Sequence, residues 1–344
     1  MTTPSFTLAH ASDRISPARK AASISIALCT YNGARFLKAQ LDSFLAQTRL
    51  PDELVVCDDG STDDTLVILE EFEEHAPFPI RIFRNEQRLG STKNFEKAIG
   101  LCTGDLVATS DQDDVWLPEK LALSEAALDS EPGRGFVFTN ADVVDEELNP
   151  VGYTMWDAIH FGLAARWRVR RGHAFKVLLQ QWVVTGATMM FRSEYRPFIL
   201  PIPENWIHDG WIAFIIGALA PAGFVERSTV QYRQHSAQQI GGKKLTWREL
   251  YRKAREVGPP HFRQAYERSL LVQERLQRLA PHLRDVGLLS LIAGKVDHQR
   301  RRLMIAEMSS RWGRVACSLG ELLRGGYWRY SSPACSHFLK DLIL

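Results

Sequence analysis

Apolar segments of strand length alternate with amphipathic segments of helix length through the first part of the chain, and this alternation limits the fold more than any other feature. The expected strands cover 24–31 (ISIALCTY), 53–59 (ELVVCDD), 80–83 (IRIF), 105–111 (DLVATSD) and 135–144 (GFVFTNADVV). Helical patterns lie between them, over 34–48, 62–76, 91–102 and 118–130. Strands separated by helices of this length predict an α/β fold with a mostly parallel central sheet flanked by helices.

Polar side chains follow the apolar part of four of these strands. The segments are CTYN (29–32), CDDGS (57–61), SDQDD (110–114) and TNAD (139–142). In open sheets of this kind, ligands bind beyond the carboxyl ends of the strands. We therefore expect the four segments to gather at one edge of the sheet and to form a binding site there.

The rest of the chain changes character twice. Between 146 and 240 we expect strands at 183–192 and 226–235 and a helix at 208–220. The apolar run 211–225 is too short for a bilayer span and is interpreted as a buried helix with its turn. Beyond 242 the pattern is helical and rich in arginine. The predicted division is a flexible leader over 1–22, an α/β domain over 23–242 with halves at 23–145 and 146–242, and a basic α-helical region over 243–344.

The formal net charge of +2 conceals an uneven distribution. Residues 241–344 hold 20 Lys and Arg against 9 Asp and Glu, so the rest of the chain carries a net charge of −9. Basic amphipathic helices suit an anionic membrane surface. A solvated basic face, or a homo-oligomer contact, would explain the same pattern. An acidic front domain without a binding motif argues against nucleic acid.

The five cysteines have no paired spacing, so we expect reduced, mostly buried thiols.

Asp111 and Asp113 are separated by one residue directly after a buried strand, so in an extended conformation both point to the same side. Hard cations such as Mg²⁺ and Mn²⁺ prefer these oxygen ligands and keep positions open for water or phosphate. The alternative is a solvated acidic turn before the helix that begins near Pro118, with Asp114 as its N-cap. The crowding of like charges favours a cation at this edge.

Six segments, taken together, resemble the family 2 glycosyltransferases. In chain order they are ISIALCTYNGARFLKAQLDSFLAQT, DELVVCDDGSTDDTLVIL, SDQDDVWLPEKL, TGATMMFR, HDGWIAF and YRQHSAQQIGG, and they extend over about residues 22–242. Within the family they are most similar to bacterial rhamnosyltransferase-type enzymes of polysaccharide assembly. The resemblance implies a GT-A fold with a Rossmann-like nucleotide-binding half, a nucleoside-diphosphate-sugar donor, a divalent metal (Mg²⁺ or Mn²⁺) and an inverting single displacement.

Carried over by position, the resemblance assigns the donor site to residues at the strand ends. The segment with Thr30, Tyr31, Asn32 and Asp59 would hold the base and ribose, and Arg88 and Lys93 would lie near the donor. From the residues alone, a carboxylate such as Asp59 can accept hydrogen bonds from a base or can cap a helix, and a lone Tyr can be packing. Asp111 and Gln112 complete the donor contacts, and Gln112 stands where some members carry another acid.

The resemblance also assigns the metal and the catalytic base. Asp111 and Asp113 would be the metal pair, with Asp113 as the more direct ligand. Asp209 in IHDGW would take the acceptor proton, a role that the positive end of the helix supports, although an N-cap fits the same place. His235 could complete the metal shell, contact a phosphate or lie in solvent, and Arg233 could pair with the diphosphate.

The expected function is the transfer of a sugar, with dTDP-L-rhamnose as the preferred donor, to a glycan or lipid-linked acceptor in cell-surface polysaccharide synthesis. A UDP-sugar donor and a non-catalytic scaffold of a polysaccharide assembly complex are the alternatives. A sugar-nucleotide nucleotidyltransferase is disfavoured because TYNGARFLK (30–38) contains one glycine and so lacks a triphosphate loop. We expect a cytoplasmic protein, with peripheral contact at the inner face of the cytoplasmic membrane as one role for the basic tail.

Overall fold

The structure is a computed structural model that describes residues 21–235, 252 and 258–343. The predicted leader therefore lies outside the described residues except for its last two, and so do 236–251 and 253–257. The strands are β1 (Ile24–Thr30), β2 (Glu53–Asp58), β3 (Ile80–Arg84), β4 (Leu106–Ser110), β5 (Val115–Trp116), β6 (Phe136–Val144), β7 (Pro150–Thr154), β8 (Met189–Arg192) and β9 (Ala222–Arg233).

The helices of the α/β domain connect and cover these strands. They are α1 (Ala34–Leu45), α2 (Thr65–Glu73), α3 (Ser91–Leu101), α4 (Lys120–Asp129), α5 (Met155–Ala158), α6 (Leu163–Arg170), α7 (Ala174–Leu178), α8 (Arg196–Ile199) and α9 (His208–Leu219). The apolar run at 211–225 is divided as expected, because α9 ends before Pro221 and β9 begins after it. No helix in the described parts of the chain has both the length and the apolar character needed to cross a bilayer.

The strands form one nine-stranded sheet in the order β3-β2-β1-β4-β8-β6-β9-β5, with β7 paired to β6. Strands β1, β2, β3, β4, β6 and β9 run in one direction, and β5, β7 and β8 run in the other. The half built from β1 to β4 is therefore parallel throughout, as its alternation with helices predicts. The antiparallel pairs lie in the second half of the sheet.

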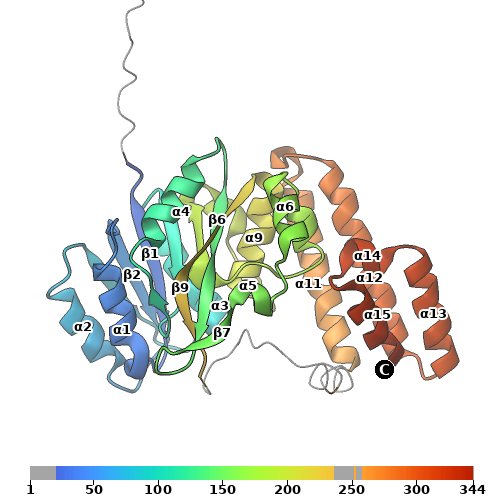
Figure 1. Ribbon diagram of the computed structural model, residues 1–344, viewed down its shortest axis with the longest axis horizontal. Coiled ribbons are helices and arrows are strands. Elements are labelled where there is room, and N and C mark those ends of the chain that lie inside the picture. Colours follow the sequence, from blue (N-terminus) through green and yellow to red (C-terminus); the bar gives the residue numbers. More distant parts are fainter. Residues whose placement is uncertain (1–20, 236–251, 253–257, 344) are drawn as a thin grey trace, which may run out of the picture.

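Both faces of the sheet are covered, which explains why its strands are apolar runs without an exposed side. In β1, Ile24, Ile26 and Leu28 face one apolar cluster, to which α1, α2 and α4 contribute. Ala27 and Cys29 face the other cluster, to which α3 and α9 contribute. Figure 1 shows the sheet between these helices, with α1 and α2 at one end of the molecule.

The C-terminal helices are joined to the second of these clusters. They are α11 (Pro259–Arg278), α12 (Gly287–Glu307), α13 (Arg311–Leu323), α14 (Gly326–Tyr330) and α15 (Ala334–Ile343). Val272 and Leu276 of α11 and Leu288 and Ile292 of α12 are buried in the cluster that also contains α9. Helices α13 to α15 lie further out, at the end of the molecule opposite α1 and α2 (Figure 1).

Of two expected strands in the second half of the sheet, one is confirmed and one needs correction. The segment TNAD (139–142) lies inside β6, which ends at Val144 as expected and shifts register with β9 around Asn140. The segment 183–192 is a strand only from Met189, because Gly186–Thr188 form a 3₁₀ turn whose Gly186 packs closely against His208. Three cysteines are buried, as expected, whereas Cys317 and Cys335 are exposed.

A buried carboxylate ties the start of β2 to its neighbours. Glu53 is 8% exposed and accepts hydrogen bonds from the hydroxyl of Ser25, from the backbone N–H and hydroxyl of Thr103, and from Arg81. Burial alone would raise the pKa of Glu53, but these donors outweigh it and lower the pKa to about 2. The ionised form is therefore part of the folded structure.

We expect Glu53→Gln to lower the free energy of unfolding by about 3 kcal/mol at neutral pH, the value of a shift of this size. Because the pKa is lower in the folded state, this stability is present above pH 4.5 and is lost as the pH falls toward 2. Urea denaturation of both proteins across this range measures the difference. An unchanged difference between pH 7 and pH 3 would contradict the assignment.

Candidate functional site

Strands β1, β2 and β4 end together at one edge of the sheet. In the parallel register Thr30 lies beside Asp58, and Leu28 lies beside Ser110, so the loops that follow the three strands emerge side by side. The Thr30 hydroxyl donates to Asp58 Oδ2 at 2.9 Å and is 2% exposed. Thr30, predicted to contact the donor, is thus engaged within the protein.

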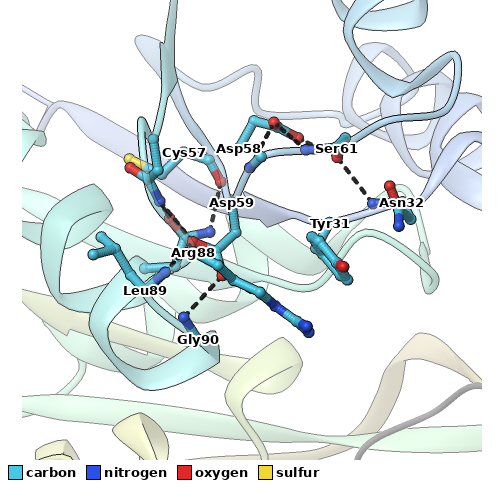
Figure 2. A network of polar contacts seen from close by, with 12 residues as sticks. Tyr31, Asn32, Cys57, Asp58, Asp59, Ser61, Arg88, Leu89 and Gly90 are labelled. Carbon is cyan, nitrogen blue, oxygen red and sulfur yellow. Dashed lines mark hydrogen bonds and ion pairs between the residues drawn. The ribbon is translucent and has the colours of Figure 1, made fainter.

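Asp59 organises the loop that follows β3. Its Oδ1 accepts hydrogen bonds from Asn85 Nδ2 at 2.8 Å and from the Leu89 N–H at 2.7 Å. Its Oδ2 accepts from the Gly90 N–H at 2.8 Å, and Arg88 Nε lies 4.0 Å away (Figure 2). Each carboxylate oxygen can accept two hydrogen bonds, so Oδ2 retains the capacity for one more donor.

Arg88 and Tyr31 form a stacked pair at this edge. The Arg88 guanidinium carbon lies 3.9 Å from the centre of the Tyr31 ring, and the two side chains lie next to Asp59 (Figure 2). Gln112 holds the backbone of Tyr31 from the other side, because its amide accepts from the Tyr31 N–H at 2.8 Å and donates to the Tyr31 carbonyl at 3.0 Å. Gln112 therefore positions Tyr31, a role that the sequence did not indicate.

Asn32 and Lys93 are also engaged with neighbouring segments. Asn32 adopts a φ of +48°, its N–H donates to Ser61 Oγ, and its side-chain oxygen accepts from the Thr62 N–H. The Lys93 ammonium lies 2.8 Å from Glu96 Oε2 and 2.6 Å from the Ile202 carbonyl oxygen. The positive charge of Lys93 is thus paired with Glu96 of the same helix, α3. Lys93 does not belong to the stacked pair of Arg88 and Tyr31.

Three carboxylates meet beyond β4. The pKa of Asp111 is raised to about 8 by burial, then by the charges of Asp113 and Asp209. Asp113 Oδ2 lies 2.8 Å from His235 Nε2. The residues that follow β9 therefore contact the loop that follows β4. The structure thus places Asp111, Asp113, Asp209 and His235 in one neighbourhood, although they are far apart in the sequence.

The residues behind this loop hold it in place. Arg233 is 4% exposed, and its guanidinium donates to the carbonyl oxygens of Asp113 and Glu146. Its N–H donates to Asp114 Oδ1 at 3.1 Å. The interpretation of Asp114 as an N-cap is wrong, because α4 begins at Lys120 with Glu119 in the cap position, and Asp114 is fully buried instead. Arg233, predicted to pair with the diphosphate, supports the loop from inside the protein.

Asp209 lies in the first turn of α9 and is held by backbone donors. Its Oδ2 accepts from the Gly186 N–H at 2.9 Å, and its Oδ1 accepts from the Gly210 N–H at 2.6 Å. Burial raises the pKa of Asp209 to about 7 in spite of these donors. The alternative role as an N-cap does not apply, because Ile207 occupies the cap position of α9.

Close packing surrounds Asp209. A Cβ at Gly210 would lie 2.3 Å from the Trp182 ring, so only glycine allows this contact. His208 is buried, stacks on Phe95 with 3.7 Å between ring centres, and has no hydrogen-bond partner at either ring nitrogen. Trp211 is 1% exposed and belongs to the core. Trp182, whose ring packs against Gly210, is 37% exposed.

The described residues fit a divalent cation only in part. Asp111 and Asp113 supply oxygen ligands of the type that Mg²⁺ and Mn²⁺ prefer. Burial, then the charges of Asp113 and Asp209, raise the pKa of Asp111, and a bound cation would oppose both effects. However, residues 21–235 and 258–343 contain no group of three or more His, Cys, Asp and Glu side chains already arranged around a metal. A cation here would need phosphate or water oxygens to complete its shell, as is usual for Mg²⁺.

Comparison with known proteins assigns the domain that carries this edge. Residues 25–194 match the model of the family described as "Glycosyl transferase family 2". This stretch, which includes Tyr31, Asp59, Asp111 and Asp113, is therefore similar to family 2 glycosyltransferases. Asp209, Arg233 and His235 lie beyond the matched residues.

Individual relatives agree with this assignment. An uncharacterized glycosyltransferase of Nostoc sp. is 41% identical over 224 residues, which are 62% of this chain and 65% of that protein. The chain thus spans less than two thirds of the length of this relative. The dTDP-rhamnosyl transferase RfbG of Shigella flexneri is 26% identical over 239 residues, which are 66% of this chain and 77% of that protein.

A solved structure shows the same fold. The crystal structure of S. aureus TarS 1-349 in complex with UDP-GlcNAc superposes with a TM-score of 0.59 and 15% sequence identity, and the match covers 93% of this chain and 90% of that one. The expected GT-A fold, with a mixed sheet between helices and a C-terminal helical region, is confirmed.

The crowding of carboxylates predicts a stability that depends on pH. The pKa of Asp111 is about 8 in the folded protein and about 3.8 without the fold, so stability falls as the pH rises from about 4 to 8. We expect Asp111→Asn to raise the free energy of unfolding at pH 8 in EDTA by on the order of 2 kcal/mol. The gain should shrink toward pH 5.

Thermal or urea denaturation in EDTA measures this gain. Asp64→Asn is the matched control, because Asp64 is exposed at the start of α2 and its side chain makes no capping hydrogen bond. If Asp111→Asn is no more stable than this control at pH 8, burial and the neighbouring carboxylates do not raise the pKa of Asp111 in the folded protein.

Proposed function

We propose that this chain is an inverting glycosyltransferase that moves a sugar from a nucleoside-diphosphate sugar to a hydroxyl group of a glycan or lipid-linked acceptor, in cell-surface polysaccharide synthesis. One observation carries the proposal. Asp111 and Asp113 follow β4, Asp209 begins α9, and the charge of Asp209 is close enough to raise the pKa of Asp111. The carboxylate pair proposed for the donor side therefore lies near the carboxylate proposed as the acceptor-side base.

The donor nucleotide would lie along the ends of β1 and β2. The Tyr31 ring offers a face for the base, and Asp59 Oδ2 retains the capacity to accept one hydrogen bond from a base N–H or a ribose hydroxyl. Arg88 is half-exposed and lies between these two groups, where its charge would meet the nucleotide phosphates. Thr30, Asn32 and Gln112 contribute by holding this edge in shape.

Asp111 and Asp113 are the proposed ligands of an Mg²⁺ or Mn²⁺ ion, with His235 at hydrogen-bond distance from Asp113 as the third candidate. A bound divalent ion would supply positive charge to the diphosphate leaving group. The protein's part is to hold the loop that carries the two carboxylates at the edge of the sheet. Arg233 and Gln112 do so by holding the loop through backbone contacts on its two sides.

Asp209 is the proposed general base. The acceptor hydroxyl attacks the anomeric carbon, its proton passes to the Asp209 carboxylate, and the anomeric C–O bond to the diphosphate breaks. The bonding electrons of that C–O bond leave with the nucleoside diphosphate, and the configuration at the anomeric carbon is inverted. The Gly186 N–H holds Oδ2 and the Gly210 N–H holds Oδ1, so the carboxylate is oriented before the acceptor binds. A pKa of about 7 suits proton transfer near neutral pH.

The proposed donor sugar is L-rhamnose linked to dTDP. The support is the 26% identity with the dTDP-rhamnosyl transferase of Shigella flexneri over 66% of this chain. A UDP-sugar is the alternative donor. A thermal-shift screen of dTDP-, UDP- and GDP-sugars, with and without Mn²⁺, distinguishes these donors.

We expect Asp209→Asn to lower kcat by about 10³-fold or more, because an amide cannot accept the acceptor proton. Donor binding should change little, since Asp209 lies on the acceptor side. In the wild-type protein, kcat/KM should rise with pH up to about 7 and then level off, because the base must be ionised. Transfer from dTDP-L-rhamnose to a hydroxyl acceptor, followed by product chromatography, measures both effects.

The control for this experiment is Glu226→Gln, on an exposed carboxylate of β9 that pairs with Arg170 at the surface. It should retain wild-type kcat and the same pH profile. If Asp209→Asn transfers sugar at the wild-type rate, Asp209 is not the base.

A second prediction concerns the cation. Asp113→Asn should weaken Mn²⁺-dependent binding of the donor nucleotide by about tenfold or more, because it removes the charge of one proposed ligand. Calorimetry with dTDP and Mn²⁺ measures this loss, and titration without the metal gives the reference. If nucleotide affinity is the same with Mn²⁺ and with EDTA, a metal has no part in donor binding.

A further inference from the structure

The fully buried side chains of helix α13 are polar, whereas several of its large apolar side chains are exposed. Ser318 and Glu321 are its buried residues, and both are 0% exposed. On its outer face, Trp312 is 83% exposed, Leu319 is 45% exposed and Leu323 is 88% exposed. With the exposed Ala316 they follow a spacing of four, three and four residues, so they form one stripe, the α13 face.

The inward side of α13 is fixed by a buried ionic contact. Glu321 Oε1 lies 2.6 Å from His298 Nδ1, and Glu321 Oε2 accepts from Arg301 Nε at 2.6 Å, both on α12. A Cβ at Gly326 would lie 1.8 Å from Glu321 Oε1, so the glycine after α13 leaves room for this contact. Breaking a buried charged contact is costly, so α13 is held in this orientation, and the α13 face points outward as part of the folded structure.

Between residues 308 and 343 the exposed charged side chains have one sign. From 308 to 343 the acidic residues are Glu321 and Asp341, both 0% exposed, and Asp341 accepts two hydrogen bonds from Arg302. Arg311 and Arg324, at the two ends of α13, and Arg329 of α14 are exposed. A solvated protein surface of this size usually mixes both signs. Here the exposed charges are cationic and they border apolar side chains.

We propose that the α13 face docks on an anionic membrane surface. Trp312, Leu319 and Leu323 would enter the boundary between headgroups and acyl chains, and Arg311 and Arg324 would contact lipid phosphates. A second copy of the chain fits this face less well, because a symmetric pair would bring arginines together with no exposed acidic residue between 308 and 343 to oppose them. The helix lies at the outer end of the molecule, where a flat surface can reach it (Figure 1).

This proposal does not depend on the glycosyltransferase activity, because α13 lies outside the matched family domain. If both proposals hold, the membrane contact would keep the catalytic domain close to a lipid-linked acceptor. If the chain proves not to transfer sugar, the α13 face can still be tested on its own.

Co-sedimentation of the full chain with lipid vesicles tests the proposal. Vesicles of equal parts phosphatidylglycerol and phosphatidylcholine should bind the protein, whereas vesicles of phosphatidylcholine alone should bind it at least tenfold more weakly. Leu323→Glu should reduce binding to the anionic vesicles by about tenfold or more, because it removes a large apolar group and adds a like charge. Arg311→Gln and Arg324→Gln should each reduce binding about fivefold.

Val67→Glu is the matched control. Val67 is an apolar residue of α2, 52% exposed, at the end of the molecule opposite α13 (Figure 1), so this variant carries the same added charge away from the proposed surface. It should bind vesicles like the wild type. Circular dichroism and thermal denaturation of each variant verify the fold, and the arginine variants keep the test valid if Leu323→Glu does not fold.

Three results would overturn the proposal. The first is equal binding of wild type and Leu323→Glu to the anionic vesicles. The second is no binding of the wild type to either kind of vesicle. The third is light scattering that shows a wild-type dimer which Leu323→Glu converts to a monomer, because the α13 face would then be a contact between copies.

Discussion

Repulsion between carboxylates at the edge of the sheet is the constraint around which the site is built. Asp111, Asp113 and Asp209 come from two distant parts of the chain, and their mutual charge together with burial raises the pKa of Asp111 to about 8. A fold tolerates such a cluster only if other contacts hold the carboxylates in place. Those contacts are backbone hydrogen bonds: Gly186 and Gly210 hold Asp209, and Arg233 holds the loop of Asp113 through its carbonyl.

The donor side of the edge shows a division between residues that form the surface and residues that shape it. Tyr31 and Arg88 are stacked and accessible, whereas Thr30, Asn32 and Gln112 use their polar atoms on neighbouring segments. Asp59 belongs to both groups. It accepts hydrogen bonds from the backbone N–H groups of Leu89 and Gly90, and Oδ2 can still accept one more. Substitution of any member of the second group would therefore change the site indirectly.

The C-terminal helices combine two surfaces with opposite character. Helices α11 and α12 bury apolar residues against the core that contains α9, which links this region to the turn that carries Asp209. Helix α13 buries Glu321 against His298 and Arg301 and leaves Trp312 and Leu323 exposed. The first surface makes the helices part of the fold, and the second is available to a partner. The positive charge of this region is evident from composition. The structure adds which of its helices belong to the core and which side of α13 is exposed.

The sequence by itself determined the alternation of strands and helices, the parallel half of the sheet and the edge where β1, β2 and β4 end, and its short motifs proposed Asp111, Asp113 and Asp209 as site residues. Each of these follows from local periodicity, from the rule that parallel strands share their carboxyl ends, or from short motifs. Only the tertiary structure decided that Asp114 is buried instead of capping α4, and that Arg233 and Gln112 hold the loop. It also decided which side of α13 faces solvent. These outcomes depend on contacts between residues up to 120 positions apart, and local pattern carries no information about which polar atoms such contacts will satisfy.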